Sequence, residues 1–122
     1  STNFTIFSGL DMMINRKSWD DKVYAPDQRV DRETALKIST IWGAYYMFKE
    51  DLLGSLESGK WADFIVVDRD YLTIPEDEIG DVKVLMTVVG GKPIHLVPSL
   101  ANEFGMEATG AQVTHGGDAV NW

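Results

Sequence analysis

Apolar side chains recur every three or four residues from Val30 to Phe48, which is the clearest periodic pattern in the chain. This spacing places them on one side of a helix. Asp31 is suited to begin the helix as its N-cap, and Thr40 is placed to begin a second short helix after a bend. We expect the stripe to pack in a core and not to bind a cofactor; its members are Ala35, Ile38, Ile41, Trp42, Tyr45 and Phe48.

A shorter helix is predicted near the start of the chain, across Leu10 to Ile14. Ser8 is the candidate N-cap, because a hydroxyl there can accept a hydrogen bond from a free amide of the first turn. Arg16 and Lys17 suit the C-terminal end, where the helix dipole favours cations. Residues 19–28 combine a charge cluster with a Pro-Asp turn signal, so we expect a loop there.

The pattern changes to continuous apolar runs after Leu53. Phe64–Val67 is a four-residue run rich in β-branched side chains and bounded by turn or charged residues. Such a run favours a strand that is buried on both faces. The stretch that follows contains Pro75 before three acidic residues, which suggests one acidic helical turn.

A hairpin is predicted next in the chain. Val82–Val89 reads as a strand, Gly90-Gly91 as a two-residue turn and Lys92–Val97 as the returning strand. Pro93 has no amide hydrogen to donate to a neighbour, so the returning strand should lie at a sheet edge.

These patterns predict an α+β fold in three consecutive segments. Residues 1–50 are helical, residues 51–97 hold a small, mostly antiparallel sheet, and residues 98–122 form an irregular tail. The tail is rich in Gly, Ala and Thr, and its apolar residues follow no period.

The composition of the chain argues against some classes of binding partner. The 122 residues amount to a single domain, with a net charge of −8 and no cysteine. The negative charge argues against nucleic acid and against an anionic membrane. No stretch approaches the roughly 20 apolar residues that a membrane span requires. The cellular compartment is not indicated.

The chain offers few residues for metal chemistry. Its two histidines, His95 and His115, are dispersed and do not have the spacing of paired metal ligands. We therefore predict no catalytic, metal-binding or cofactor-binding residues in this chain. The acidic run Glu76, Asp77, Glu78 and Asp81 is expected to be a solvated face. Glu57 and Lys60 are expected to form an exposed ion pair.

Gly54 to Asp68 resembles the C-terminal signature of the amidohydrolase superfamily, with the sequence GSLESGKWADFIVVD. Val84 to Lys92 resembles the final hairpin of these enzymes, and the Pro75–Ile79 insertion most resembles amidohydrolase family 3. The resemblance implies metal-dependent hydrolysis of carbon–nitrogen bonds. It also implies that the helices are the last ones of a TIM-type barrel and that the strands belong to a small β-sandwich.

The ligands in this family lie on the barrel, which the resemblance places outside this chain. Zinc or another divalent metal is thus expected in the complete parent enzyme and not in this chain. Asp11 is the only early Asp near the expected ligand position, but it sits in a helical pattern and is not assigned that role.

The alternative is a non-catalytic interaction or oligomerisation module. Both interpretations leave the apolar stripe without its barrel partner. Each large apolar side chain left in water forgoes roughly 1.5–3 kcal/mol of burial free energy. We therefore expect self-association as a homodimer, or binding to the missing barrel part of the parent chain; the chain's own tail, with Phe104, Met106 and Trp122, is the other means of covering the stripe.

Overall fold

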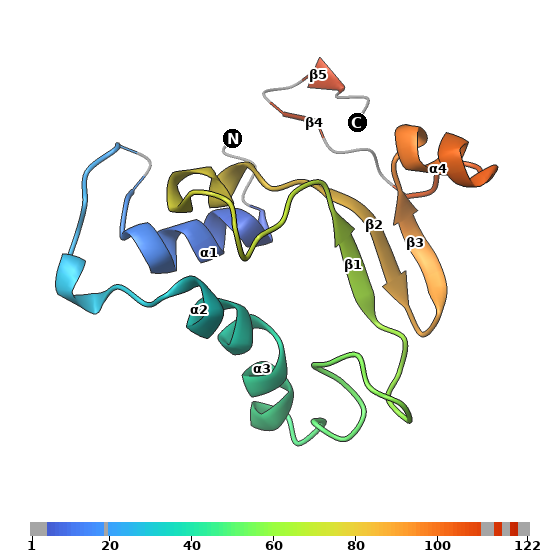
Figure 1. Cartoon of the computed structure of the whole chain (residues 1–122), viewed down its shortest axis with the longest axis horizontal. Helices are drawn as coiled ribbons and strands as arrows, with labels where there is room; N and C mark the ends of the chain where they lie inside the picture. The colour runs from blue at the N-terminus through green and yellow to red at the C-terminus, as the bar shows by residue number, and fades with distance from the viewer. Residues whose placement is uncertain (1–4, 19, 111–113, 116–117, 120–122) are drawn as a thin grey trace. The chain divides into compact units, whose positions relative to one another are not determined.

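The computed structural model describes residues 5–18, 20–110, 114–115 and 118–119 and has the α+β composition that the sequence predicts (Figure 1). Its helices are α1 (Ile6–Asn15), α2 (Arg32–Ser39), α3 (Ile41–Tyr46) and α4 (Pro98–Phe104), with 3₁₀ turns η1 (Pro26–Gln28) and η2 (Glu76–Asp81). Its strands are β1 (Phe64–Val67), β2 (Val84–Val89), β3 (Lys92–Leu96), β4 (Thr114–His115) and β5 (Asp118–Ala119).

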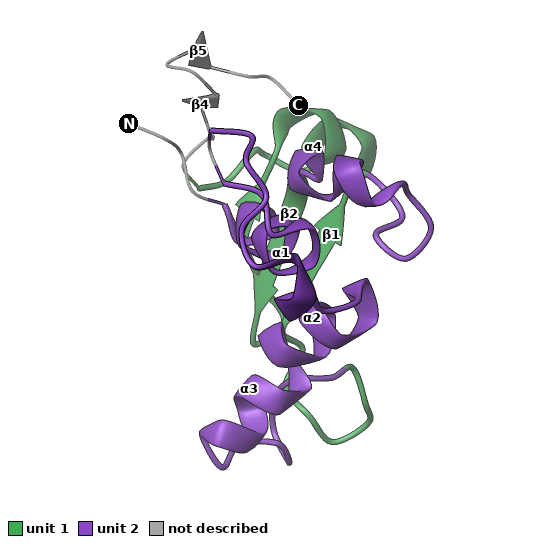
Figure 2. Ribbon diagram, turned by 90° about the vertical axis from the view of Figure 1, so that its left-hand side faces the viewer, with its two compact units in different colours: residues 1–3, 56–68, 84–122 green, residues 4–55, 69–83 purple. Residues whose placement is uncertain are grey.

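The chain forms two compact units that interleave along the sequence (Figure 2). The helical unit contains residues 4–55 and 69–83, and the sheet unit contains residues 56–68 and 84–122. The sequence pattern predicted three consecutive segments. That division differs from the observed one because the pattern gave no sign that residues 69–83 pack with the helices.

Helix α1 begins earlier than predicted. Thr5, and not Ser8, is its N-cap: the Thr5 hydroxyl accepts a hydrogen bond from the Ser8 amide at 3.1 Å. The prediction of Ser8 was wrong because Phe7 lies on the same buried side as Leu10 and Ile14. Adding Phe7 to the apolar side moves the helix start back by one turn.

Helix α2 begins as predicted. The Asp31 carboxylate accepts a hydrogen bond from the Thr34 amide at 2.7 Å, and this bond lowers the pKa of Asp31. The predicted bend at Thr40 is confirmed, with φ −127° and ψ −98°. Thr40 does not cap α3 with its side chain, however. Its hydroxyl donates instead to the Leu36 carbonyl at 2.7 Å, although Thr40 is the N-cap residue from which α3 starts, as predicted.

Helix α3 ends in a Schellman motif. The Phe48 amide donates to the Tyr45 carbonyl at 3.0 Å and the Lys49 amide donates to the Ala44 carbonyl at 2.9 Å. Phe48 occupies the left-handed position of this motif, with φ 57°. Glycine usually fills that position, because a side chain there costs about 1–2 kcal/mol.

Most of the apolar stripe of α2 and α3 stays exposed in the described structure, as expected of a chain that does not cover the stripe alone, whereas the expectation that the stripe packs in a core is not met there. Ala35 is buried, but Trp42 is 48% exposed, Tyr45 58% and Phe48 89%. The buried residue of α3 is Ala44, against which Gly54 packs closely. The side of α3 that faces the rest of the helical unit thus carries the small residue Ala44. The aromatic rings lie on the exposed sides of the helix.

A reciprocal pair of hydrogen bonds attaches residues 69–83 to the helices. The Tyr71 hydroxyl donates to the Arg32 carbonyl at 2.7 Å, and the Arg32 guanidinium donates to the Tyr71 carbonyl at 2.9 Å. The Tyr71 ring also meets Phe7 of α1 with centroids 6.2 Å apart. Burial raises the pKa of the Tyr71 phenol.

Turn η2 continues this attachment by packing on α1. Ile79 of η2 and Leu10 of α1 are both almost completely buried. The predicted acidic helical turn is confirmed, with Pro75 immediately before its first residue.

The sheet has the strand order β1-β2-β3, and both pairings are antiparallel, as predicted. Val89 pairs with Lys92 across Gly90 and Gly91, whose φ values of 57° and 80° suit a two-residue turn. Pro93 lies on β3 at a sheet edge, which confirms its predicted place. The prediction that β1 is buried on both faces was wrong. Ile65 is 46% exposed, because nothing in the described sheet covers its side.

Residues 98–122 are not uniformly irregular, so that prediction was wrong as well. Pro98 begins α4, Gly105 ends it with φ 65°, and β4 pairs with β5. Leu96 and Thr109 exchange two backbone bonds of 2.9 and 3.1 Å. The helix escaped prediction because its seven residues are too few to show a period. Of the tail residues that could cover the stripe, Phe104 and Met106 are exposed and Trp122 lies outside the described residues.

No helix in the described ranges has both the length and the apolar character needed to cross a membrane.

The Tyr71 phenol gives a pH-dependent prediction. Replacing Tyr71 with Phe should lower the free energy of unfolding by about 1 kcal/mol at pH 7, because the Arg32 carbonyl loses its donor. The raised pKa means that the folded state holds the phenolic proton more tightly than the unfolded chain does. This contribution is complete below the unfolded pKa of about 10 and is lost as the pH rises through the folded pKa.

Urea unfolding of both proteins between pH 7 and pH 11 measures this difference. The gap between wild type and Tyr71→Phe should shrink above about pH 10. A gap that stays constant across the whole range would contradict the assigned role of the hydroxyl.

Candidate functional site

The signature segment, residues 54–68, is the natural place to look for function, and its first residue has a packing role. Gly54 has φ 92°, and a Cβ atom added there would lie 2.8 Å from the Ala44 Cβ and 2.9 Å from the Ile41 Cα. Backbone and side chain of α3 therefore leave room only for glycine. The requirement comes from close approach to α3 and from the positive φ together.

The Glu57–Lys60 pair forms as predicted, with a distance of 3.0 Å between charged atoms. It is less exposed than expected, because the Lys60 side chain is 13% exposed while that of Glu57 is 64% exposed. The Lys60 amide also donates to the Glu57 carbonyl at 3.1 Å, so the turn between them is closed by backbone and side chain alike.

Asp63 joins the signature segment to the hairpin. Its carboxylate accepts a hydrogen bond from the Gly90 amide at 2.6 Å, and the Ala62 carbonyl accepts one from the Gly91 amide at 2.9 Å. The Ala-Asp pair of the signature thus holds both glycines of the β2–β3 turn. A short carboxylate placed before β1 fixes the turn, and no substrate chemistry is needed to explain it.

The described residues bring no metal site together. Within the ranges that the structure describes, no group of three or more His, Cys, Asp or Glu side chains could hold a metal ion. His95 is half-buried on β3, opposite Thr87 of β2. His115 pairs with Asp118 between β4 and β5, and its side chain lies outside what the structure describes. The prediction that neither is a ligand stays a prediction.

Asp11 has a packing role on α1. It accepts a hydrogen bond from the Asn15 amide group at 2.5 Å, and Asn15 also donates to the Glu76 carbonyl at 3.0 Å. The other Asp11 oxygen lies 2.9 Å from where a Gly80 Cβ would stand. Asp11 and Asn15 therefore connect α1 to η2.

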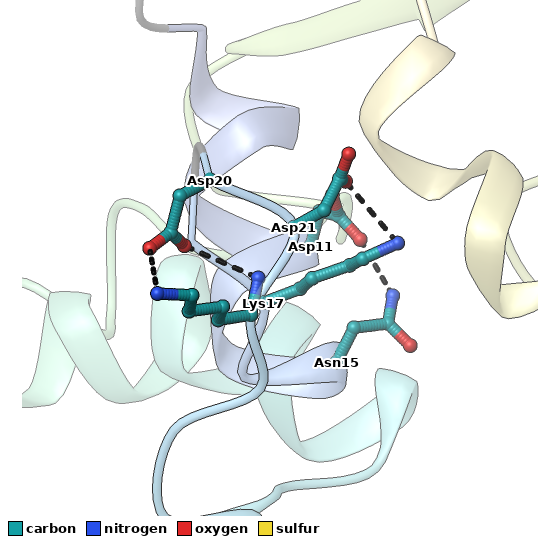
Figure 3. A network of polar contacts seen from close by, with 6 residues as sticks. Asp11, Asn15, Lys17, Asp20 and Asp21 are labelled. Carbon is teal, nitrogen blue, oxygen red and sulfur yellow. Dashed lines mark hydrogen bonds and ion pairs between the residues drawn. The ribbon is translucent and has the colours of Figure 1, made fainter.

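The loop after α1 carries further carboxylates, and each faces a cation (Figure 3). Lys17 pairs with Asp21 at 3.3 Å, and Lys22 pairs with Asp20 at 3.9 Å. These are surface pairs that organise the turn after Arg16. In η2, Glu76, Asp77 and Asp81 are exposed and Glu78 is half-buried, in agreement with a largely solvated face.

A depression of about 440 Å³ lies beside α1. Its lining consists of Gly9, Met12, Met13, Arg16, Lys17, Ser18 and Tyr24. Arg16 is held in place because its Nε donates to the Tyr24 carbonyl at 3.1 Å. The lining contains two cations and two thioethers but no carboxylate or histidine, so it offers no general base and no metal ligand pair.

The sequence identified the signature segment but did not predict which contacts its residues make. The bonds from Asp63 and Ala62 to the hairpin join positions 27 and 29 residues apart, from residue 63 to 90 and from 62 to 91. The Ala-Asp step before a strand and the Gly-Gly turn were each visible in the sequence. Only the antiparallel pairing of β1 with β2 brings them together.

Comparison with known proteins adds two findings. A family model described as the amidohydrolase family matches residues 2–95, which is 94 of the 122 residues. An N-substituted formamide deformylase from Arthrobacter pascens is 36% identical over 66 residues, which cover 54% of this chain. The chain spans 12% of that relative's length. No solved structure matches the chain.

The two glycines of the signature allow a matched test of its packing role. Gly54 and Gly59 both have φ 92°, but nothing lies within 4 Å of a Cβ added at Gly59. Gly54→Ala should therefore destabilise the protein more than Gly59→Ala does, by about 1–3 kcal/mol of overpacking. Both variants share the conformational penalty of a positive φ.

Chemical denaturation of the two variants beside the wild type provides the measurement. Equal losses of stability would show that the close approach of Gly54 to α3 is unimportant.

Proposed function

Because this chain belongs to the amidohydrolase family, we propose that it forms the C-terminal structural portion of a metal-dependent amidohydrolase acting on non-peptide carbon–nitrogen bonds. The observation that carries the proposal is how the signature is used. Gly54 packs on α3, Lys60 pairs with Glu57, and Asp63 holds the Gly90 amide. Each signature residue so described makes a contact within the scaffold.

In this proposal the chemistry belongs to the remainder of the enzyme. The side chains described here do not fit a metal centre, since they form no cluster of three ligating groups. The proposal assigns the ligands, and the zinc or other divalent ion that they hold, to the part of the parent enzyme that this chain does not contain. We derive no catalytic step from this chain.

The order of the elements supports the finer assignment. Helices α1 to α3 come first and are proposed to be the last helices of the barrel, while β1 to β3 are proposed to be C-terminal strands of the small β-sandwich. The antiparallel order β1-β2-β3 leaves β1 and β3 at the edges of the described sheet, where further strands can pair.

The relative suggests the substrate class. Its name describes the removal of a formyl group from N-substituted formamides, and we propose the same class of bond for the parent enzyme of this chain. Since the match spans 12% of that protein, the assignment rests on a short aligned stretch and not on a substrate pocket.

A chimera tests the structural role. The 66-residue stretch of the deformylase that aligns with this chain should be replaceable by the matching residues of this chain. We expect the chimera to be soluble and to retain deformylase activity, whereas deletion of the stretch should abolish folding. A chimera that carries Gly54→Ala should lose thermal stability relative to the first chimera. A folded, metal-loaded deletion variant with full activity would contradict the proposal.

The chain expressed alone should neither bind a stoichiometric divalent metal nor hydrolyse N-substituted formamides, because it lacks a cluster of ligands in its described residues. Elemental analysis after dialysis against zinc, with formate release measured in parallel, checks both expectations. About one zinc per chain that disappears in the His95→Ala, His115→Ala double variant would overturn this expectation.

The exposed rings of α3 favour a second candidate function, that of an interaction module. The two functions are compatible, because a C-terminal scaffold can also carry the contact between enzyme subunits.

A further inference from the structure

The aromatic surface of α3 is defined here as Trp42, Tyr45 and Tyr46 of the helix together with Met47 and Phe48, which directly follow its last residue. The five side chains are 48%, 58%, 88%, 57% and 89% exposed. At about 200 Å² for each aromatic side chain, the four rings expose on the order of 550 Å². Soluble monomers rarely leave apolar patches of more than a few hundred Å² uncovered, and those that they do leave are often functional.

Phe48 supplies a second, independent observation. It stands at the left-handed position of the Schellman motif, with φ 57°, and is almost fully exposed. Glycine would satisfy the same two hydrogen bonds at lower cost. Among the described residues the ring is almost completely uncovered, so it gains little burial in return for the strained backbone. Strain of this kind points to a role outside the fold of the single chain.

Local charge identifies the kind of partner. Residues 32–52 carry Arg32, Lys37 and Lys49 against Glu33, Glu50 and Asp51, so their net charge is zero. The whole chain has a net charge of −8, which the other residues therefore carry. Two copies that meet through this segment bring no net like charge together.

We propose that the aromatic surface of α3 is a two-fold interface between two copies of this chain. An isologous contact places the same rings on both sides and closes after two subunits. The exposed ring area approaches the roughly 800 Å² per partner of a standard interface, and the remainder can come from half-exposed neighbours such as Ile38 and Leu52. The proposal stands on the exposed rings, the strain and the charge, and it does not rest on the proposed enzymatic origin.

Analytical ultracentrifugation over a wide concentration range is the experiment, with the full 122-residue chain and three variants. The wild type should show a discrete monomer–dimer equilibrium. Phe48→Gly and Tyr46→Ser should each raise the dimer Kd by at least about tenfold, as expected of aromatic anchors at an interface. Leu72→Ser is the matched control: Leu72 is 58% exposed in the same compact unit but outside the surface, and its variant should dimerise like the wild type.

Phe48→Gly separates an interface defect from a folding defect. Glycine relieves the left-handed backbone, so this variant should keep the circular dichroism spectrum of the wild type. As a monomer it should unfold at a urea concentration no lower than that of the wild-type monomer. A wild type that is monomeric at every concentration, or that forms open-ended aggregates, would overturn the proposal. So would a dimer that survives both aromatic substitutions, or one that Leu72→Ser weakens equally.

Discussion

The helical unit depends on the reciprocal hydrogen bonds between Tyr71 and Arg32. These two bonds join residues 39 positions apart, and they hold the segment 69–83 to helices that come much earlier in the sequence. Once Tyr71 is fixed against Phe7, turn η2 can place Ile79 against α1, where both partners are buried. Without this attachment the first helices would have only one another to cover their apolar sides.

The signature segment carries the family resemblance in residues whose described contacts are those of a scaffold. Gly54 is needed because α3 comes within contact distance, and Asp63 because the hairpin turn has an amide to satisfy. Such requirements constrain residue type as strictly as catalysis does. Recognising the family from this segment therefore locates part of its scaffold.

Features that depend on neighbours in the chain were predictable, and features that depend on distant partners were not. Asp31 caps α2 and the Gly90-Gly91 turn closes the hairpin, because both need only residues within a few positions. Burial of Trp42 or Ile65 depends on what covers each side, which no local pattern contains. The bond from Asp63 to Gly90 is of the same kind: both residues stood out in the sequence, but the pairing of β1 with β2 brings them together.

The interleaving of the two units has a consequence for the order of folding during synthesis. Strand β1 leaves the ribosome before residues 69–83, yet its partner β2 follows them. The helical unit can therefore fold first, while the apolar run of β1 remains unpaired until β2 has been synthesised. A nascent chain in this interval exposes a short β-prone segment, the kind of surface that chaperones protect and that promotes misassembly when synthesis outpaces pairing.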